Sequence, residues 1–347
     1  MLSHMVAPVA PEHGGRTLAW AGAVVEPGLR AAVGRLCPSV RRVVGYHQGW
    51  WDAQGVPCEG SPGKGLRAAL ALLSARATSP DALLGVPAAV AVELVHSFTL
   101  LHDDLVDGDR TRRGRPAAWT VFGVPAAILA GDSLLAAGID TLLTSGHPSA
   151  QAAAATLTQT LQDLVNGQCA DLDFEFRDDV TPEQFLAMIA HKTGSLLGCA
   201  CALGTLLAGG SQERVAALGR FGRNLGLAFQ LTDDLLGLWG ATSVLGEPVG
   251  SDLLRRRKSF PVLAALRSGW PAATELAHFY TRTTAPGAAD IPDMLRLVET
   301  CGGREATEHR AERAVHQARR QLDILPMPTD VRDEFQQLLA MAARRDQ

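Results

Sequence analysis

One segment of the chain brings three carboxylates together at its end. In ELVHSFTLLHDDLVDGDRTRRGRP (residues 93–116), Asp103, Asp104 and Asp107 follow a mainly apolar run. If the run is helical, each residue advances by about 100°, so Asp103 and Asp107 share one sector with His96. Carboxylates so close raise one another's pKa and oppose folding unless a cation lies between them. Mg²⁺ prefers a few carboxylates with water and phosphate oxygens, and the spacing therefore predicts a magnesium site formed by these three aspartates.

A second acidic pair occurs in FQLTDDLLGLWG (residues 229–240). Gln230 precedes Asp233 and Asp234 by three and four positions, so a helix would place it on their face. One such motif alone is as compatible with a solvated helix end as with a metal site. Two of them, 130 positions apart (103 to 233) and each within apolar sequence, indicate two walls of one cavity.

Basic residues supply the complementary charge. Those near the acidic motifs or near glycines are Lys64, Arg67, Arg112, Arg113, Lys192 and the run Arg255–Lys258. Any one of them could be an ordinary surface charge. Together they indicate a ligand that carries phosphates, because arginine binds phosphate through two N–H groups and lysine acts as a point charge.

Helices must position these residues. The chain has 347 residues, 47% hydrophobic and only 5% aromatic, a composition that favours helix over a β-sandwich. Thr181-Pro182-Glu183-Gln184 has the pattern of a capped helix start. We predict an all-α fold, with residues 1–15 as a flexible N-terminal segment and residues 16–347 as one catalytic domain.

Charge, cysteines and hydropathy restrict the class of protein further. A formal charge of −4 gives no general basic field for nucleic acid. The six cysteines form no CxxC pair, and we expect buried free thiols in a reducing compartment. The N-terminus lacks the pattern of a secretory signal. The most apolar window, residues 83–101, is interrupted by Pro87, Glu93 and His96, which favours a core helix over a transmembrane segment. These features predict a cytoplasmic protein.

Several motifs, in this order, resemble those of the trans-isoprenyl diphosphate synthases, the polyprenyl synthetase family. They are GKGLR (63–67), ELVHSFTLLHDDLVD (93–107), RTRRGRP (110–116), GQCAD (167–171), HKTG (191–194), FQLTDD (229–234) and KSFP (258–261). The resemblance covers roughly residues 30–340. It implies an isoprenoid synthase helical bundle around a deep central cavity, a homodimer, and three Mg²⁺ ions. It also implies condensation of isopentenyl diphosphate with an allylic diphosphate, head to tail (1′-4).

The resemblance also assigns roles to individual residues. Asp103, Asp107 and Asp233 match the principal metal ligands, with Asp104 in support, and Lys192 joins the first three as a catalytic residue. Matches to the isopentenyl diphosphate contacts are Lys64, Arg67, His96 and Arg113. Matches to the allylic diphosphate contacts are Arg112, Lys192, Thr193, Gln230 and Lys258, with Gln168 and Asp171 lining that side. Phe98 and Thr99 match positions that limit product length and indicate a C15–C20 product, with geranylgeranyl favoured over farnesyl diphosphate.

The chain departs from the family pattern at two positions near the second acidic motif. Gly237 stands where a third acid is usual, and Glu247 stands where a lysine is usual. In RRRKSFP (255–261) the lysine register is also shifted by one, so Arg257 can share the role assigned to Lys258. The alternatives are a class I terpene cyclase on the same scaffold and a non-catalytic partner subunit of a prenyl synthase. A cyclase would have lost the isopentenyl diphosphate residues, and a partner subunit would have lost the first acidic motif. Both are present here.

Overall fold

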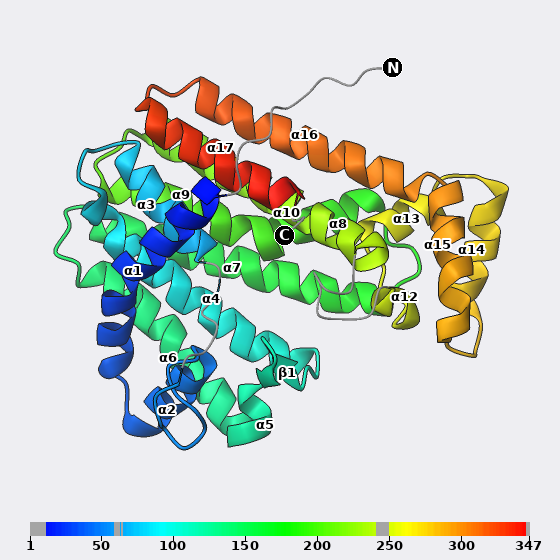
Figure 1. Ribbon diagram of the computed structural model, residues 1–347, viewed down its shortest axis with the longest axis horizontal. Helices are drawn as coiled ribbons and strands as arrows, with labels where there is room; N and C mark the ends of the chain where they lie inside the picture. Colours follow the sequence, from blue (N-terminus) through cyan, green and yellow to red (C-terminus); the bar gives the residue numbers. More distant parts are fainter. Residues whose placement is uncertain (1–11, 59–62, 64, 241–249, 345–347) are drawn as a thin grey trace. The chain divides into compact units, whose positions relative to one another are not determined.

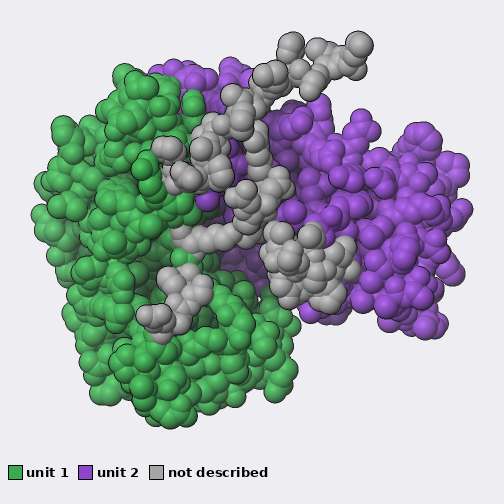
Figure 2. All heavy atoms as spheres, in the orientation of Figure 1, with its two compact units in different colours: residues 1–159, 199–219, 326–337 green, residues 160–198, 220–325, 338–347 purple. Residues whose placement is uncertain are grey.

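The computed structural model is almost entirely helical (Figure 1). It describes residues 12–58, 63, 65–240 and 250–344. The predicted all-α class is confirmed. The chain divides into two compact units, drawn in green and purple in Figure 2: residues 1–159, 199–219 and 326–337 form unit 1, and residues 160–198, 220–325 and 338–347 form unit 2. That the catalytic part is a single domain stays a prediction.

Unit 1 consists mainly of the first half of the chain. Its elements are α1 (Glu12–Gly34), α2 (Pro38–His47), α3 (Leu66–Arg76), η1 (Ala82–Gly85), α4 (Val86–Val106), β1 (Thr111–Arg112), β2 (Arg115–Pro116), α5 (Ala118–Phe122) and α6 (Val124–Leu143). The unit boundaries fall within α7 (Ala150–Glu175), α9 (Ser195–Leu207), α10 (Gln212–Trp239) and α17 (Thr329–Arg344). Helix α1 begins at Glu12, inside the segment that we predicted to be flexible; residues 1–11 lie outside the described part.

Helix α4 is the central element of unit 1. Pro87 in its first turn fits the start of a helix, where its missing N–H is not needed. Small residues let α6 approach it closely, because a Cβ on Gly138 would lie 3.2 Å from the Ala91 carbonyl oxygen. The helix ends where Asp107 donates its N–H to the Asp103 carbonyl at 2.8 Å and Gly108 adopts a φ of 68°. The acidic motif therefore occupies the C-terminal end of a buried helix.

A tight hairpin follows this end. Strands β1 and β2 pair antiparallel, with Arg112 opposite Arg115. The two residues between them, Arg113 and Gly114, both have positive φ values, 52° and 73°. Two such residues in a two-residue loop are typical of a type I′ turn. The hairpin thus fixes Arg113 at its tip, in a conformation that is uncommon for a residue with a side chain.

Unit 2 contains the remaining helices. They are α8 (Pro182–Ile189), η2 (Ala190–Gly194), α12 (Ser251–Leu254), α13 (Phe260–Leu266), α14 (Pro271–Thr281), η3 (Ala288–Asp290), α15 (Ile291–Thr300) and α16 (Gly303–Asp323). The predicted cap of α8 is confirmed: Gln184 N donates to the Thr181 hydroxyl at 3.2 Å, and Thr181 N donates to the Gln184 side chain at 3.0 Å.

Two expectations from composition need revision or comment. The six cysteines, all within the described part of the chain, form no disulfide with one another, as predicted, but burial was wrong for Cys37, Cys58 and Cys169, which are exposed. By length and composition alone, three helical stretches of the described chain could cross a membrane: residues 82–106, 124–143 and 182–207. The first contains α4, in which Leu94, Val95 and Leu101 are buried in unit 1, as expected of a core helix.

Candidate active site

The first acidic motif separates into two kinds of carboxylate. Asp103 is partly exposed and Asp107 is exposed, one turn further along α4. Asp104 is only 1% exposed, and its Oδ1 accepts hydrogen bonds from Nε of Arg112 at 2.7 Å and from Nη2 of the same arginine. Burial raises the pKa of Asp104, and the Arg112 guanidinium opposes that change. Asp104 therefore orients Arg112, whereas Asp103 and Asp107 are accessible.

A basic cluster lies two turns before these carboxylates in unit 1. His96, on α4, interacts electrostatically with Arg67 of α3 and with Arg113 at the hairpin tip, and its pKa is well below the usual value because the ring is buried among these cations. A Cβ on Gly63 would come within 2.7 Å of the Arg113 guanidinium, so the chain before α3 also touches it. The structure thus brings together Arg67, His96 and Arg113. Lys64 lies outside the described residues.

The sequence did not indicate two further residues of this basic cluster. Glu93, one turn before His96, accepts the Ala68 N–H at 3.0 Å and attracts the Arg67 guanidinium. His47, the last residue of α2, interacts with His96, Arg112 and Arg113. A glutamate on the His96 face of α4 was visible in the sequence, but nothing near His47 connects it with the later motifs.

The two chain-length positions lie on different faces of α4. The Phe98 ring packs edge-on against His102, with the ring centroids 4.8 Å apart, and His102 in turn contacts the Ile128 carbonyl of α6. Thr99 lies one turn before Asp103 and donates its hydroxyl to the His96 carbonyl at 2.8 Å. Thr99 therefore shares the face of the accessible carboxylate, and Phe98 faces α6.

In unit 2, many of the later motifs line one cavity of about 330 Å³. The predicted residues on its wall are Asp171, Lys192, Thr193, Gln230 and Asp233. Lys192 Nζ lies 2.6 Å from Asp171 Oδ2. The cavity also has apolar walls from Phe185, Met188 and Ile189 of α8.

A local irregularity presents Lys192 and Thr193. Residues 190–194 form one turn of π-helix between α8 and α9, a feature that often marks functional sites. Glycines allow α7 and α10 to approach this turn closely. A Cβ on Gly167 would lie 2.4 Å from the Lys192 backbone nitrogen, and one on Gly226 would lie 2.8 Å from the Gly194 Cα. The HKTG and GQCAD motifs therefore belong to one packing arrangement.

The second acidic motif repeats the division seen in the first. Asp233 is partly exposed on the cavity wall, whereas Asp234 is 8% exposed. Asp234 accepts hydrogen bonds from Gln230 Nε2 at 3.2 Å and from the Phe260 N–H at 3.1 Å. Burial raises its pKa to about 7, which these bonds oppose. Gln230 also accepts a bond from Thr193 at 3.2 Å.

An unpredicted carboxylate lies beside the altered third position. Gly237 and Asp252 both line the unit 2 cavity, and a Cβ on Gly237 would lie 3.4 Å from Asp252 Oδ2. Asp252 comes from α12, and Arg257 Nη1 lies 3.9 Å from its Oδ1. The cavity therefore has a further carboxylate near position 237, from a different part of the chain. Glu247, the other departure, lies outside the described residues.

The structure gives Lys258 a different environment from the one we predicted. Its Nζ donates to the carbonyls of Phe174 at 3.1 Å, Glu175 at 3.3 Å and Arg177, and the side chain is 10% exposed. The carbonyls at the end of α7 attract a cation, which explains why the lysine turns there. Arg257 lines the cavity instead.

Gln168 is also not among the residues that line this cavity, and its Nε2 is buried without a hydrogen-bond partner in the described part of the chain.

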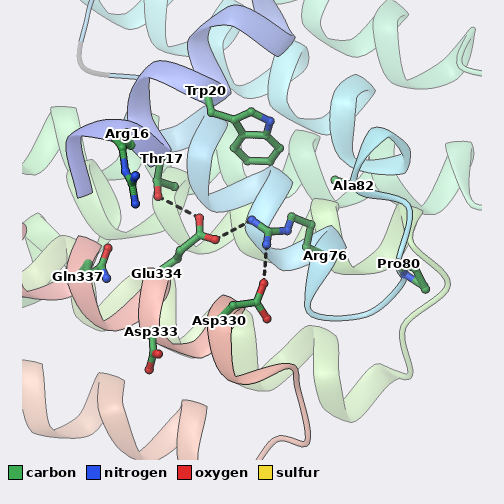
Figure 3. A pocket seen from close by; sticks show the side chains of 10 residues that line it. All are labelled: Arg16, Thr17, Trp20, Arg76, Pro80, Ala82, Asp330, Asp333, Glu334 and Gln337. Carbon is green, nitrogen blue, oxygen red and sulfur yellow. Dashed lines mark hydrogen bonds and ion pairs between the residues drawn. The ribbon is translucent and has the colours of Figure 1, made fainter. Parts of the chain in front are cut away.

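A larger cavity of unit 1, of about 600 Å³, contains none of the predicted residues (Figure 3). There Arg76 bridges Glu334 at 2.8 Å and Asp330 at 2.9 Å, and Thr17 donates to Glu334 at 2.9 Å. The Trp20 ring lies 5.6 Å from the Arg76 guanidinium carbon. These contacts join α1, α3 and α17, and we give them a structural role.

Comparison with known proteins identifies the family. The model of the polyprenyl synthetase family matches residues 58–298. The chain belongs to the polyprenyl synthetase family. It is 44% identical over 293 residues to a geranylgeranyl diphosphate synthase of Mycobacterium tuberculosis, covering 84% of each chain. It is 40% identical over 297 residues to a (2E,6E)-farnesyl diphosphate synthase of Mycobacterium bovis, covering 85% of this chain and 83% of the relative.

Solved structures of the family agree with this fold. A polyprenyl synthetase from Streptomyces coelicolor is 43% identical, with a TM-score of 0.89 over 94% of this chain and 98% of that one. A geranylgeranyl pyrophosphate synthase from Corynebacterium glutamicum, solved in complex with calcium and isoprenyl diphosphate, is 28% identical, with a TM-score of 0.78 over 98% of this chain and 99% of that one. The predicted family and helical fold are confirmed.

The carboxylates of this polyprenyl synthetase chain fit Mg²⁺ that arrives with a phosphate ligand. Within the described residues, no three His, Cys, Asp or Glu side chains are grouped so that they could hold a metal ion by themselves. Mg²⁺ typically uses one or two carboxylates and takes its remaining ligands from water and phosphate oxygens. Asp103 and Asp107, one helical turn apart and accessible, provide such a pair, and Asp233 provides a further carboxylate on the unit 2 cavity.

Proposed function

We propose that the protein is a Mg²⁺-dependent short-chain prenyltransferase that condenses isopentenyl diphosphate with an allylic diphosphate, head to tail. The observation that carries the proposal is the basic cluster of Arg67, His96 and Arg113. A cyclase uses one diphosphate and needs no such cluster in addition to its carboxylates. His96 and Asp103 are seven residues apart on α4, which is roughly 10 Å along a helix axis. This spacing suits two diphosphates held at neighbouring sites.

The residues have separate tasks in this mechanism. Bound Mg²⁺ would neutralise the charge of the allylic diphosphate; Asp103 and Asp107 of unit 1 would hold it, Asp233 on the unit 2 cavity would add a further carboxylate, and the family resemblance suggests three ions. On that cavity, Lys192 and Arg257 hold the diphosphate as its C1–O bond breaks, and Asp171 orients both basic groups. Thr193 and Gln230 also line the cavity, and by the family resemblance Arg112 is a further contact to this diphosphate. The double bond of isopentenyl diphosphate then attacks the allylic carbon, and a proton is lost from the new product to the departing diphosphate.

Water must be kept from the allylic cation. Phe185, Met188 and Ile189 give the unit 2 cavity an apolar side next to its charged side, as such a reaction requires. The basic cluster of Arg67, His96 and Arg113 holds isopentenyl diphosphate without metal, and the family resemblance adds Lys64 to these contacts.

The finer features rest on the family resemblance. We propose a C15–C20 product, geranylgeranyl rather than farnesyl diphosphate, because an aromatic residue, Phe98, stands five residues before Asp103. We also propose a homodimer in the cytoplasm.

The test is an incubation of the purified protein with Mg²⁺, radiolabelled isopentenyl diphosphate and each of dimethylallyl, geranyl and farnesyl diphosphates. We expect label in a C15 or C20 alcohol after dephosphorylation. A hydrocarbon or alcohol formed from the allylic substrate alone, without label, would favour a cyclase instead.

A further inference from the structure

His47 is held firmly at the end of α2. The residues on either side of it are tied to two other elements of unit 1. Tyr46 donates its hydroxyl to the Pro116 carbonyl of the hairpin at 2.8 Å, and Arg115 donates back to the Tyr46 carbonyl at 3.3 Å. Gln48 donates to the Ser97 hydroxyl of α4 at 2.7 Å. The His47 ring is therefore fixed between the element that carries Arg113 and the helix that carries His96.

The surroundings of the ring are strongly basic. His47 lines a small cavity, of about 20 Å³, together with Arg112, Arg113 and Arg115. Such a volume holds roughly one water-sized group. Arg112 is neutralised by Asp104, but Arg113 is at the tip of the hairpin and exposed. A cation would be repelled from this cavity, and an oxygen atom of an anion would be attracted to it.

The ring has a nitrogen aimed at no protein group. His47 Nε2 is buried and has no hydrogen-bond partner among the described residues, and the same is true of Arg67 Nε in the same cluster. A buried polar group without a partner costs stability. Two such nitrogens in one basic cluster are accounted for if both belong to a site whose ligand offers several acceptor oxygens.

The ring is also uncharged. Burial, and then the charges of Arg113 and Arg112, lower the pKa of His47 to about 3, so the imidazole is neutral near pH 7 and carries a single N–H. A neutral donor adds a hydrogen bond to a phosphate without adding a further cation to a cluster that already contains several. It is therefore suited to binding and not to proton transfer.

We propose that His47 Nε2–H donates a hydrogen bond to an oxygen of the diphosphate held by Arg67 and Arg113, and that His47 is thus a further binding residue for the isopentenyl substrate. This inference rests on the proposed function, which supplies that diphosphate. It assigns His47 to substrate affinity and leaves the reaction at the allylic carbon to other residues.

The first experiment measures binding without turnover. Inorganic pyrophosphate is titrated into the protein in EDTA by calorimetry, so that binding through metal does not contribute. The variants are His47→Gln, whose amide can place an N–H near the position of Nε2, His47→Asn, whose shorter amide cannot, and His47→Leu. His316→Gln, at an exposed position of α16, is the matched control. Thermal unfolding of each variant is recorded in parallel.

We expect the His47→Leu and His47→Asn substitutions to weaken pyrophosphate binding about tenfold, the effect of about one hydrogen bond to a charged group. Gln should stay within about threefold of the wild type, and the control should match it. In turnover assays, Leu and Asn should raise the KM for isopentenyl diphosphate by a similar factor, with little change in kcat or in the KM for the allylic partner. If Leu does not fold, the comparison of Gln with Asn decides.

Two results would overturn the inference. One is equal pyrophosphate affinity in the wild type and in the Asn and Leu variants. The other is equal weakening in Gln and Asn together with equal losses of thermal stability, which would indicate a structural role. Failure of the proposed function looks different: the wild type would incorporate no isopentenyl label with any allylic partner, while the pyrophosphate titrations would still report on His47.

Discussion

The acidic pair of unit 1 and the acidic pair of unit 2 have the same sequence, Asp-Asp, but the buried aspartates have different hydrogen-bond partners. Asp104 is paired with the Arg112 guanidinium, whereas Asp234 is bonded to the uncharged Gln230 amide and Phe260 N–H. In both pairs the second aspartate is buried and the first is partly exposed. The second aspartate of each pair therefore bonds to neighbouring protein groups, and we propose that the first, which is partly exposed, binds metal.

The two acidic motifs differ in the position of the third acid. Unit 1 has Asp107 one turn after Asp103, at the end of the same helix. Unit 2 has Gly237 at the corresponding position, with Asp252 of α12 beside it. We infer that Asp252 takes the place of the third acid, so that unit 2 assembles from two elements what unit 1 takes from one.

The largest effect is expected at Asp103. Asp103→Ala should lower kcat/KM at least about a thousandfold, because it removes a metal ligand at which leaving-group charge is neutralised. Helicity by circular dichroism should be unchanged, since the side chain is at the exposed end of α4. Asp293→Ala, at an exposed position of α15, is the control. Near-normal turnover of Asp103→Ala would break the assignment of the first aspartate as the ligand.

The Asp252 inference can be tested by moving the carboxylate. Asp252→Ala should lower kcat about ten- to a hundredfold, less than the roughly hundred- to thousandfold loss on removing a principal electrostatic contact in an active site. Adding Gly237→Asp to that variant should restore most of the loss, because the new side chain starts 3.4 Å from the lost oxygen. Steady-state kinetics of the single and double variants measure this. An unimproved double variant would mean that Asp252 has another role.

Arg257 and Lys258 should differ in kind. Arg257→Ala should raise the KM for the allylic diphosphate about tenfold, because Arg257 lines the cavity. Lys258→Ala should leave that KM nearly unchanged and lower the free energy of unfolding by about 1–3 kcal/mol, since the carbonyls at the end of α7 lose their donor. Kinetics and urea unfolding of both variants separate the roles. A KM effect larger in Lys258→Ala would restore the role we first predicted for it.

Acid should destabilise unit 1 through His47. In the unfolded chain this histidine binds a proton below about pH 6.5, but in the folded chain its pKa is about 3. Between these values the unfolded state binds more protons, so the free energy of unfolding falls as the pH is lowered. From pH 7.5 to pH 5, His47→Gln should lose about 1–2 kcal/mol less than the wild type in urea unfolding. Equal losses of unfolding free energy in the wild type and in His47→Gln would contradict a buried, neutral His47 ring.

The smallest effect is a change of product. Phe98→Ala removes an aromatic ring from the face of α4 that meets His102, and we expect products longer by one isoprene unit. Chromatography of the dephosphorylated alcohols measures their length. If the length is unchanged, the Thr99 face of the helix, which carries Asp103, is the better candidate for limiting the chain.

Local sequence patterns predicted much of this site and failed where distant segments meet. The helix before Asp103, the cap at Thr181 and the Lys192–Thr193 motif could be predicted because each depends on residues a few positions apart. Asp252 and His47 could not, because their neighbours come from other elements, α10 in one case and the hairpin and α4 in the other. The surroundings of Lys258 could not be predicted for the same reason: the carbonyls that accept its hydrogen bonds are more than 80 positions away.

The most direct test of the proposed mechanism is the metal requirement of each diphosphate. Isopentenyl diphosphate and farnesyl thiolodiphosphate, an allylic analogue that resists ionisation, are titrated separately with Mg²⁺ and with EDTA. We predict that EDTA weakens binding of the allylic analogue at least about a hundredfold and leaves the affinity for isopentenyl diphosphate within about threefold. Only the allylic diphosphate is held through metal bound to carboxylates. Equal affinity of the allylic analogue in Mg²⁺ and in EDTA would contradict Asp103, Asp107 and Asp233 as metal ligands.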